Sequence, residues 1–194
     1  MLDKIVQLIV GLGNPGQQYE QTRHNAGASL ISILSQQYVS DLKLEERFFG
    51  FIARVKIDIQ DVRLLIPNTY MNLSGKSIAA FAKFYQISPE NILVVHDDID
   101  LAPGISKYKI GGGHGGHNGL KDTIRALGNN SNFARLRIGV GHPGESDEVV
   151  NFVLKKASQN EQRLINESII NCISTIPLAV TGKWNEAMKD LHTV

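Results

Sequence analysis

The chain has 194 residues, of which 42% are hydrophobic and 20% are charged, and its formal net charge at pH 7 is +1. This composition is sufficient for a folded core and excludes the disordered, collagen-like and disulfide-stapled classes of protein. The chain lacks an apolar run of membrane-spanning length, a signal-peptide pattern and a second cysteine beside Cys172, so we expect one cytoplasmic domain over residues 1–194.

Strands and helices alternate in the predicted first half of the chain. Residues 5–12 are apolar and rich in β-branched side chains, which predicts a short buried strand followed by a glycine turn. Apolar side chains then recur at helical spacing over residues 24–38. Residues 49–59 alternate, with the odd-numbered positions through Ile59 on the apolar face, and residues 62–66 are suited to return as the second strand of a hairpin.

The predicted elements of the middle of the chain bring acidic residues to a strand end. Ser74 is a suitable N-cap for a helix that runs to about Gln86, where a following Ser-Pro pair stops it. Residues 92–95 then form a second short buried strand. His-Asp-Asp at 96–98 follows directly, at the C-terminal end of that strand.

The last part of the chain contains two more predicted strands and a long helical region. Residues 105–110 predict a strand that leads into a glycine-rich loop over 111–119, and a helix follows. Residues 136–140 predict a further strand, and the chain from about residue 147 is mostly helical, with a kink or break at Pro177. This mixture predicts an α/β fold, a single-domain three-layer sandwich in which helices flank a twisted mixed β-sheet.

Two glycine-rich motifs are similar to nucleotide-binding loops. Residues 11–16 formally match G-x-G-x-x-G, but helical periodicity begins only near His24, so no helix opens within the motif. Gly75-Lys76-Ser77 is similar to the end of a P-loop, although Tyr70 stands where the first glycine is required. A nucleotide-binding enzyme remains one alternative, and a tight strand-to-loop turn is the simpler interpretation of the first motif.

Acidic residues after the strand at 92–95 raise the question of a metal site. Asp97, Asp98 and Asp100 carry oxygen ligands of the kind that Mg²⁺ prefers. Neighbouring side chains of an extended chain point to opposite faces, so only one or two of the three carboxylates can converge. We therefore expect no bound metal, a solvated turn at Asp98 and Asp100, and a position facing a cleft for Asp97.

Six polar side chains stand beside predicted strand ends or helix starts: Asn14, Tyr19, His24, Asn72, Asp97 and Asn118. One histidine, one carboxylate and several carboxamides suit general-base hydrolysis without a covalent nucleophile. The imidazole takes a proton from water, the carboxylate stabilises the imidazolium, and the amides orient the substrate. A serine esterase is a weaker alternative, because no G-x-S-x-G motif occurs.

Positive charge is concentrated in one segment. Residues 101–140 contain six lysines or arginines and one acid, Asp122, whereas acids exceed bases in the rest of the chain. This asymmetry predicts a basic face that attracts an anion. A non-catalytic RNA-binding module built on this segment is a further alternative.

Six short motifs follow one another over about the first three quarters of the chain: Gly11-Leu12-Gly13-Asn14-Pro15-Gly16, Thr22-Arg23-His24-Asn25-Ala26-Gly27, Thr69-Tyr70-Met71-Asn72-Leu73-Ser74-Gly75, His96-Asp97-Asp98-Ile99-Asp100, Gly115-Gly116-His117-Asn118-Gly119-Leu120 and Arg137-Ile138-Gly139-Val140-Gly141-His142-Pro143. In this order they resemble the bacterial-type peptidyl-tRNA hydrolase family. The resemblance implies a monomeric α/β domain without metal or cofactor. It also implies hydrolysis of the ester between a peptide and the 3′-terminal ribose of tRNA, which recycles tRNA from peptidyl-tRNA that ribosomes release prematurely.

The resemblance further implies a role for each matching residue. His24 matches the general base of the family, Asp97 matches the carboxylate that assists it, and Asn14 matches the asparagine that distinguishes blocked from free aminoacyl ends. Four residues match contacts with the acceptor end of tRNA: Tyr19, Tyr70, Asn72 and Asn118. Tyr70 stands where the family more often has Phe, and either ring can stack on a base. The implied partner is peptidyl-tRNA, with no membrane involved.

Overall fold

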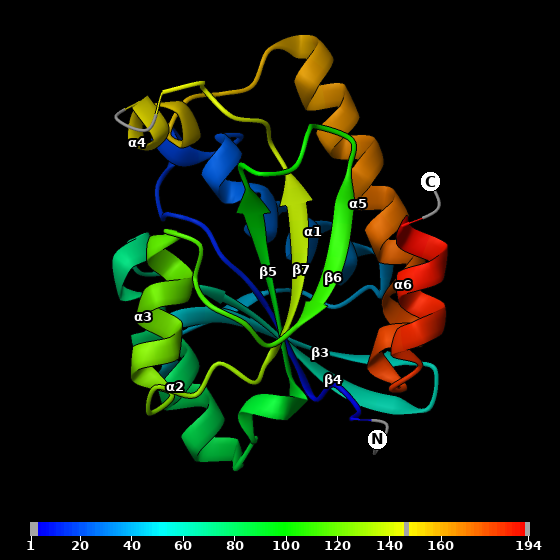
Figure 1. Cartoon of the computed structure of the whole chain (residues 1–194). Coiled ribbons are helices and arrows are strands. Elements are labelled where there is room, and N and C mark those ends of the chain that lie inside the picture. Colours follow the sequence, from blue (N-terminus) through cyan, green and yellow to red (C-terminus); the bar gives the residue numbers. More distant parts are fainter. Residues whose placement is uncertain (1–3, 146–147, 193–194) are drawn as a thin grey trace.

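The computed structural model describes residues 4–145 and 148–192 and contains one twisted sheet of seven strands (Figure 1). The strands are β1 (Leu8–Gly11), β2 (Lys43–Glu45), β3 (Gly50–Ile57), β4 (Gln60–Pro67), β5 (Ile92–Asp98), β6 (Ser106–Ile110) and β7 (Ala134–Gly139). Their order across the sheet is β2-β3-β4-β1-β5-β7-β6. The predicted strands are all present, and the sequence analysis missed only the short, polar edge strand β2.

The directions of the strands bring several strand ends to one edge of the sheet. β4, β1, β5 and β7 are parallel neighbours, whereas β3 and β6 are antiparallel to β4 and β7 respectively. The sheet is therefore mixed, as predicted. Because parallel strands end at the same edge, the segments that follow β1, β4 and β5 lie together there, which is where open α/β sheets commonly bind ligands.

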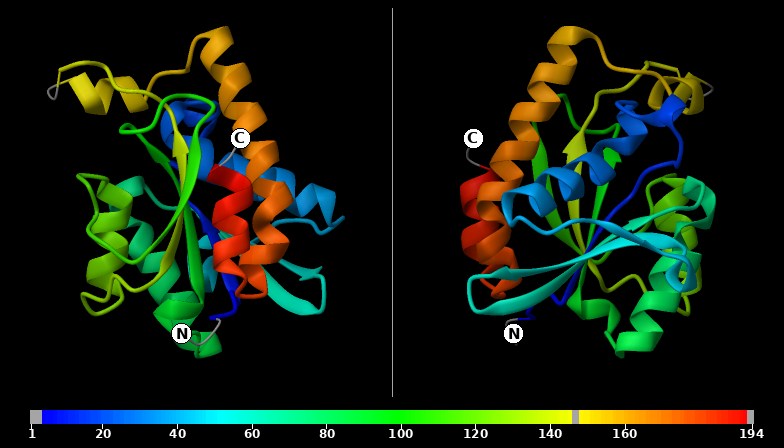
Figure 2. Two further views of the ribbon diagram at one scale, coloured as in Figure 1. Left: turned by 45° about the vertical axis from the view of Figure 1, so that its right-hand side comes forward. Right: turned by 180° about the vertical axis from the view of Figure 1, so that it is seen from behind.

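Helices cover both faces of the sheet, which confirms the predicted three-layer α/β sandwich (Figure 2). The α-helices are α1 (Ala26–Gln37), α2 (Ser74–Tyr85), α3 (Asn118–Ala126), α4 (Val149–Val153), α5 (Gln159–Val180) and α6 (Trp184–His192). One core cluster joins α1, α5 and α6 to one face, and a second joins α2 and α3 to the other. The predicted start of the C-terminal helical region, near residue 147, lies outside the described residues.

The central strand β1 explains why its sequence is continuously apolar. Ile9 belongs to the core cluster on the α1 side, while Leu8 and Val10 belong to the cluster on the α2 side, and all three are fully buried. A strand covered on both faces needs apolar residues at every position. Burial on this scale stabilises by roughly 1.5–3 kcal/mol for each large side chain, before the loss of conformational entropy is counted.

Short 3₁₀ turns occupy several of the connections. They are η1 (Gln17–Tyr19), η2 (Arg23–Asn25), η3 (Glu46–Phe48), η4 (Met71–Leu73) and η5 (Pro89–Asn91). Two of them carry residues that the sequence analysis singled out, since His24 lies in η2 and Asn72 lies in η4. Helix α1 accordingly begins at Ala26, two residues after the predicted start.

Three local predictions were wrong. Ile59 lies in the turn of the β3–β4 hairpin and is 81% exposed, because the strand alternation stops at Ile57. Ser74 does not cap α2; it is buried in the first turn, and its hydroxyl donates to the carbonyl of Met71. Of the kink or break predicted at Pro177, the break is wrong, because α5 continues to Val180.

None of the helices in the described part of the chain is both long enough and apolar enough to cross a membrane. Cys172 is buried in α5, as expected of a core residue.

Candidate active site

A cavity of about 880 Å³ opens at the edge of the sheet where β1, β4 and β5 end. Its walls contain every candidate site residue of the sequence analysis: Asn14, Tyr19, His24, Tyr70, Asn72, Asp97 and Asn118. The volume is within the range of small-ligand and cofactor pockets. Side chains predicted separately at strand ends and helix starts thus converge on one space.

His24 and Asp97 form a buried pair at the floor of this cavity. The Nδ1 atom of His24 lies 2.9 Å from each carboxylate oxygen of Asp97, and the Asp97 side chain is only 2% exposed. A carboxylate can only accept hydrogen bonds, so the proton between the two residues is on Nδ1 of His24. In neutral His24 the other ring nitrogen, Nε2, then carries a free lone pair and can act as a base.

The charges of the pair shift both pKa values in opposite directions. Burial acts to lower the pKa of His24, but the charge of Asp97 and its hydrogen bond outweigh this effect and raise the pKa above its ordinary value. Burial acts to raise the pKa of Asp97, but the adjacent imidazoles of His24 and His117 hold it far below its ordinary value. Asp97 is therefore ionised at neutral pH and stabilises a protonated His24.

Arg23, the residue before His24, anchors the turn that carries the imidazole. Its guanidinium donates to the carbonyl of Lys156 at 3.0 Å and pairs with Glu161 at 3.0 Å, and it lies over the ring of Phe152. These contacts tie η2 to the segment between α4 and α5. Because α4 also lines the cavity, the position of His24 and the position of that wall are set together.

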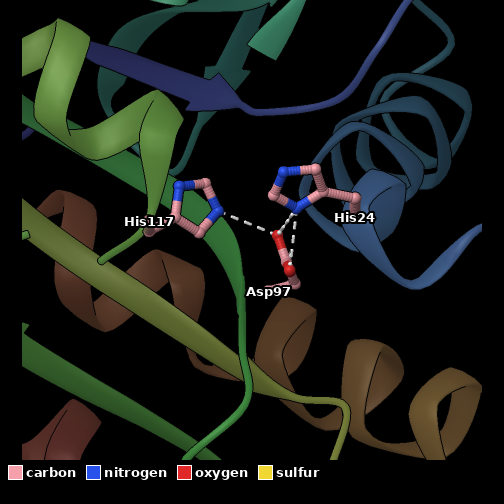
Figure 3. A group of neighbouring side chains, drawn as sticks. All are labelled: His24, Asp97 and His117. Carbon is pink, nitrogen blue, oxygen red and sulfur yellow. Dashed lines mark hydrogen bonds and ion pairs between the residues drawn. The ribbon is translucent and has the colours of Figure 1, made fainter. Parts of the chain in front are cut away.

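A third side chain, His117, shares the carboxylate of Asp97 (Figure 3). Its Nε2 atom lies 2.9 Å from Oδ1 of Asp97. Its Nδ1 atom accepts from the backbone N–H groups of Gly119 and Leu120 and so caps the N-terminus of α3. As Figure 3 shows, the carboxylate lies between two imidazoles that come from different elements.

The donors of this cluster fit a metal ion poorly. His24, Asp97 and His117 bring one ligand atom each within 4.8 Å of one another, which is close enough to surround a cation. A metal on Nε2 of neutral His117 would require the ring proton to sit on Nδ1. That atom accepts hydrogen bonds from two amide N–H groups, so metal binding would break the bonds that cap the N-terminus of α3. Asp98 is also unavailable, because it pairs with Arg137.

The loop after β1 fixes the side-chain amide of Asn14. Its Oδ1 atom accepts from the backbone N–H of Met71 at 2.7 Å, while its backbone N–H donates to Asn25 and its carbonyl accepts from the same residue. Oδ1 is therefore occupied, and Nδ2 has no partner within residues 4–145 and 148–192. Asn14 thus presents hydrogen-bond donors, not an acceptor, to the cavity.

Aromatic and amide side chains surround the cavity mouth. Tyr19 and Tyr70 meet edge to face with ring centroids 6.4 Å apart, and Tyr70 is more than half exposed. Asn72 lies in η4, and Asn118 is the first residue of α3. Both are exposed and line the same cavity. A flat group can stack at this rim while its polar edge reaches the two amides.

Cations from β6 and β7 line a second side of the cavity. The register places Lys107 opposite Arg137 and Lys109 opposite Arg135, on one face of an antiparallel pair. Like charges directly opposite each other are unfavourable unless something offsets them. The positive charge of Arg137 is offset by Asp98, whose Oδ2 atom lies 2.6 Å from Nε of Arg137. Asp98 is therefore an ion-pair partner and not the solvated turn residue predicted from the sequence.

Arg135 also holds the glycine-rich loop. It is fully buried, and its guanidinium donates to the backbone carbonyls of Gly112 and Gly113. β6 runs antiparallel to β7, so the chain leaves β6 at the far edge of the sheet and must return to place His117 beside Asp97. Gly112 and Gly116 adopt positive φ angles of 101° and 80° on the way, which favours glycine there.

The two nucleotide-binding interpretations of the glycine-rich motifs have no support in the geometry. The glycine motif at 11–16 is followed by the 3₁₀ turn η1, and no helix opens before η2 and α1, so no helix N-terminus meets a pyrophosphate there. In the P-loop-like segment, the N–H of Gly75 already donates to the carboxylate of Asp122.

His117 and Arg135 were not predicted as site residues from the sequence. Each side chain contacts a distant part of the chain. His117 bonds to Asp97, 20 residues earlier, and Arg135 bonds to the glycine-rich loop, 22 and 23 residues earlier. Neither carries a local signal beyond its residue type. His117 stands just before the helix that follows the glycine run, which is an N-cap position, but histidine is not among the residues that favour it.

Comparison with known proteins gives the family. Residues 8–194 match the sequence profile of the family described as "Peptidyl-tRNA hydrolase". The peptidyl-tRNA hydrolases of Tolumonas auensis and Aeromonas hydrophila are 54% and 55% identical to this chain over 188 residues, which cover 97% of this chain and 95% of each relative. A crystal structure of the Acinetobacter baumannii peptidyl-tRNA hydrolase is 49% identical, with a TM-score of 0.93 over 96% of this chain and 94% of that one. The chain belongs to the peptidyl-tRNA hydrolase family of enzymes.

Proposed function

We propose that this protein hydrolyses the ester between a peptide and the 3′-terminal ribose of tRNA, with His24 as the general base and Asp97 as its partner. The observation that carries the proposal is the buried His24–Asp97 pair, in which the carboxylate of Asp97 accepts a hydrogen bond from Nδ1–H of His24 and leaves Nε2 of His24 free for a water molecule in the cavity. Family membership supplies the substrate class.

The reaction needs one proton to be moved twice. His24 Nε2 takes a proton from water as the water oxygen attacks the ester carbonyl, and Asp97 stabilises the imidazolium that results. When the tetrahedral intermediate collapses, the bond from the carbonyl carbon to the ribose oxygen breaks, and His24 returns its proton to that oxygen. A positioned base contributes roughly 10²–10⁴-fold to such a reaction.

The orientation of the Asn14 amide supports selection of blocked substrates. Since Oδ1 is held by Met71, the cavity meets the Nδ2 donors. A peptide or an N-acyl group offers a carbonyl that can accept from Nδ2. A free aminoacyl end offers an ammonium group, which carries only donors. We therefore assign to Asn14 the discrimination between blocked and free aminoacyl-tRNA.

The two walls of the cavity suit the two halves of the substrate. Lys109, Arg135 and Arg137 form a cationic wall that attracts tRNA phosphates. Tyr19, Tyr70, Asn72 and Asn118 surround the entrance, where the terminal nucleotide can stack and donate hydrogen bonds. Apolar side chains of Ile99 and of the helix α4 also line the cavity and suit peptide side chains.

The setting of the activity follows from the substrate and from the site. We place the protein in the cytoplasm, where tRNA is used in translation and a lone buried thiol such as Cys172 stays reduced. A single chain carries every residue that the proposed mechanism requires, so we expect a monomer over residues 1–194. The mechanism uses no metal and no cofactor.

The test is the release of N-acetylaminoacyl groups from tRNA in the presence of EDTA. We expect the wild-type protein to cleave the blocked ester and to spare unblocked aminoacyl-tRNA. His24→Ala should lose roughly 10²–10⁴-fold in kcat while it still binds tRNA. Asn14→Asp keeps the acceptor for Met71 but replaces the Nδ2 donors, so it should lose selectivity for the blocked ester.

The same assay separates this proposal from the RNA-binding alternative. If His24→Ala cleaves the blocked ester as fast as the wild type, His24 is not the base. If the wild type binds tRNA but releases no acyl group, the protein is an RNA-binding module that shares only the fold.

A further inference from the structure

The backbone contacts of His117 decide which of its ring nitrogens carries the proton. Two amide donors, from Gly119 at 3.1 Å and from Leu120 at 3.3 Å, point at Nδ1. An Nδ1 atom that accepts hydrogen bonds carries no proton, so the ring proton is on Nε2. Protonation of Nδ1 would set an N–H group against two others and break the cap of α3.

The Nε2 proton of His117 points at the carboxylate that His24 also uses. Nε2 lies 2.9 Å from Oδ1 of Asp97, and Nδ1 of His24 lies 2.9 Å from the same oxygen and from Oδ2. Asp97 is thus held from two sides by two N–H donors. One donor belongs to the proposed base, and the other is fixed to the N-terminus of a helix.

We propose that His117 is a positioning residue for the reaction, a neutral Nε2–H donor that orients the Asp97 carboxylate toward His24 and shares its charge. This inference rests on the proposed function, since it assigns His117 a role in preparing the same base. His117 transmits the position of α3 to the site: the helix amides fix the ring, the ring fixes Oδ1, and the carboxylate fixes Nδ1 of His24.

The role has a consequence for the basicity of His24. A hydrogen bond from His117 to Oδ1 spreads the charge of Asp97 and weakens its attraction for a protonated His24. Without that bond, Asp97 would stabilise the imidazolium more strongly and His24 would hold its proton to higher pH. His117 therefore keeps the base free at a lower pH than Asp97 alone would permit.

Few other titratable groups lie near His24, Asp97 and His117, and none of them replaces the effect of His117 on the pKa of His24. The His96 ring lies 5.0 Å from the ring of His117, and burial lowers the pKa of His96 to about 3, which keeps it neutral. Its Nδ1 is occupied by the backbone carbonyl of Asp97. Asp98 is neutralised by Arg137. Among the described residues, no other ionisable side chain contacts His24, Asp97 or His117.

The first measurement is the tautomer of His117, and it does not depend on activity. Long-range ¹H–¹⁵N correlation spectra of the full-length protein with labelled histidine distinguish the Nε2–H form, the Nδ1–H form and the imidazolium. We expect the Nε2–H form across the range in which His24 titrates. An Nδ1–H form or an imidazolium at pH 7 would overturn the proposal.

The second measurement uses His117→Asn. Asparagine is a good N-cap, so its side-chain oxygen keeps the cap of α3 while the side chain is too short to reach Asp97. We expect the His24 titration, followed by the same spectra, and the acid limb of kcat/KM to move together to higher pH. We expect kcat to fall roughly 10- to 100-fold, the factor that corresponds to one hydrogen bond to a charged group, with KM within about twofold of the wild-type value.

A matched control comes from His142. Its Nδ1 also accepts a backbone N–H, from Gly144, but the residue is exposed and does not line the cavity. His142→Asn should leave the His24 titration unchanged. If His117→Asn also leaves that titration unchanged, His117 is only a helix cap and the proposal is wrong.

The two proposals fail in different ways. If His24→Ala retains hydrolysis while the spectra of His117→Asn show the expected shift, the assignment of the base fails and the contact network stands. If His24→Ala is inactive but the spectra of the wild type show His117 in the wrong tautomer, the base stands and the role of His117 fails.

Discussion

Asp97 is the residue on which the protonation of the site depends. Its carboxylate is buried, accepts from His24 and His117, and is the only anion in contact with either ring among the described residues. Burial alone would make His24 a weaker base than a free imidazole, and the charge of Asp97 reverses that effect. With His24 as the proposed base, the pH dependence of the reaction measures this contact directly.

Asp97→Asn should move the acid limb of kcat/KM to lower pH. The pKa of His24 is raised in the wild type, so the base is lost as pH falls through a value above about 6.5, the ordinary pKa of histidine. Without the charge of Asp97, burial lowers that pKa and the limb moves down. The plateau should fall roughly 10²–10⁴-fold, because an amide no longer stabilises the imidazolium.

The neighbouring acid supplies the control for this profile. Asp98→Asn removes a carboxylate that pairs with Arg137 and not with His24. We expect its acid limb to stay at the wild-type pH. An unchanged limb in Asp97→Asn, measured from pH 5 to 9, would contradict the assignment of His24 as the group that titrates.

At the scale of elements, the site depends on how closely α1 approaches the sheet. A Cβ atom on Gly27, in the first turn of α1, would lie 2.2 Å from the carbonyl oxygen of Val95 in β5 and 2.8 Å from the nitrogen of Leu12. Both neighbours are backbone atoms, which cannot move aside as a side chain can. Because His24 lies three residues before Gly27, this contact also sets the distance between His24 and Asp97.

Gly27→Ala should therefore destabilise the protein and displace His24, the proposed base. Forcing a methyl group into such a packed contact costs about 3 kcal/mol of unfolding free energy. For a chain of this size that corresponds to a fall in Tm of roughly 6–12 °C. Urea unfolding followed by the fluorescence of Trp184, which packs against Tyr108, measures the change.

Gly113→Ala is the matched control for packing. A Cβ atom at this position meets no atom within 4 Å, and the residue has no positive φ angle. The unfolding free energy should change by less than about 0.5 kcal/mol. Equal stability losses in both variants would show that the close approach of α1 is not what the first substitution disturbs.

At the scale of the whole molecule, positive charge is concentrated in one segment of the chain, to which we assign the proposed contacts with tRNA phosphates. The six cations of residues 101–140 are opposed by one acid within that segment, and three of them line the cavity: Lys109, Arg135 and Arg137. Arg135 and Arg137 are held by the loop carbonyls and by Asp98, whereas Lys109 is exposed. Lys109 is the cation most available to a phosphate.

Binding of tRNA should consequently weaken as salt rises. Each phosphate contact contributes a slope of about −0.7 to −0.9 to a plot of log kcat/KM, at low substrate, against log salt concentration. We expect Lys109→Ala to make the slope less steep by about one contact. Lys183→Ala, an exposed lysine in the turn between α5 and α6, should keep the wild-type slope. A salt-independent kcat/KM would exclude phosphate contacts from the rate.

Most of the elements could be predicted because their signals are local. The β3–β4 hairpin is predicted by the alternation of apolar and polar residues. Strand β1 is predicted by a continuous apolar run, because a strand that is covered on both faces needs apolar residues at every position. Errors arose where tertiary context overrides the local signal. Ile59 continues an alternating pattern into a turn, and Ser74, a good cap by type, is buried in the first turn of α2.

The sequence by itself determined which residue types stand at the strand ends, and parallel strands then bring those ends to one edge. His24, Asp97 and Asn14 were predicted singly beside strand ends or a helix start, and their assignment to one site followed from the resemblance to the peptidyl-tRNA hydrolase family. Only the tertiary structure decided how they are used. Contacts between distant segments place the proton on Nδ1 of His24, fix the donors that Asn14 presents and supply the hydrogen bond from His117 to Asp97. The reason is that a hydrogen bond is set by the relative position of two groups and not by the sequence around either one.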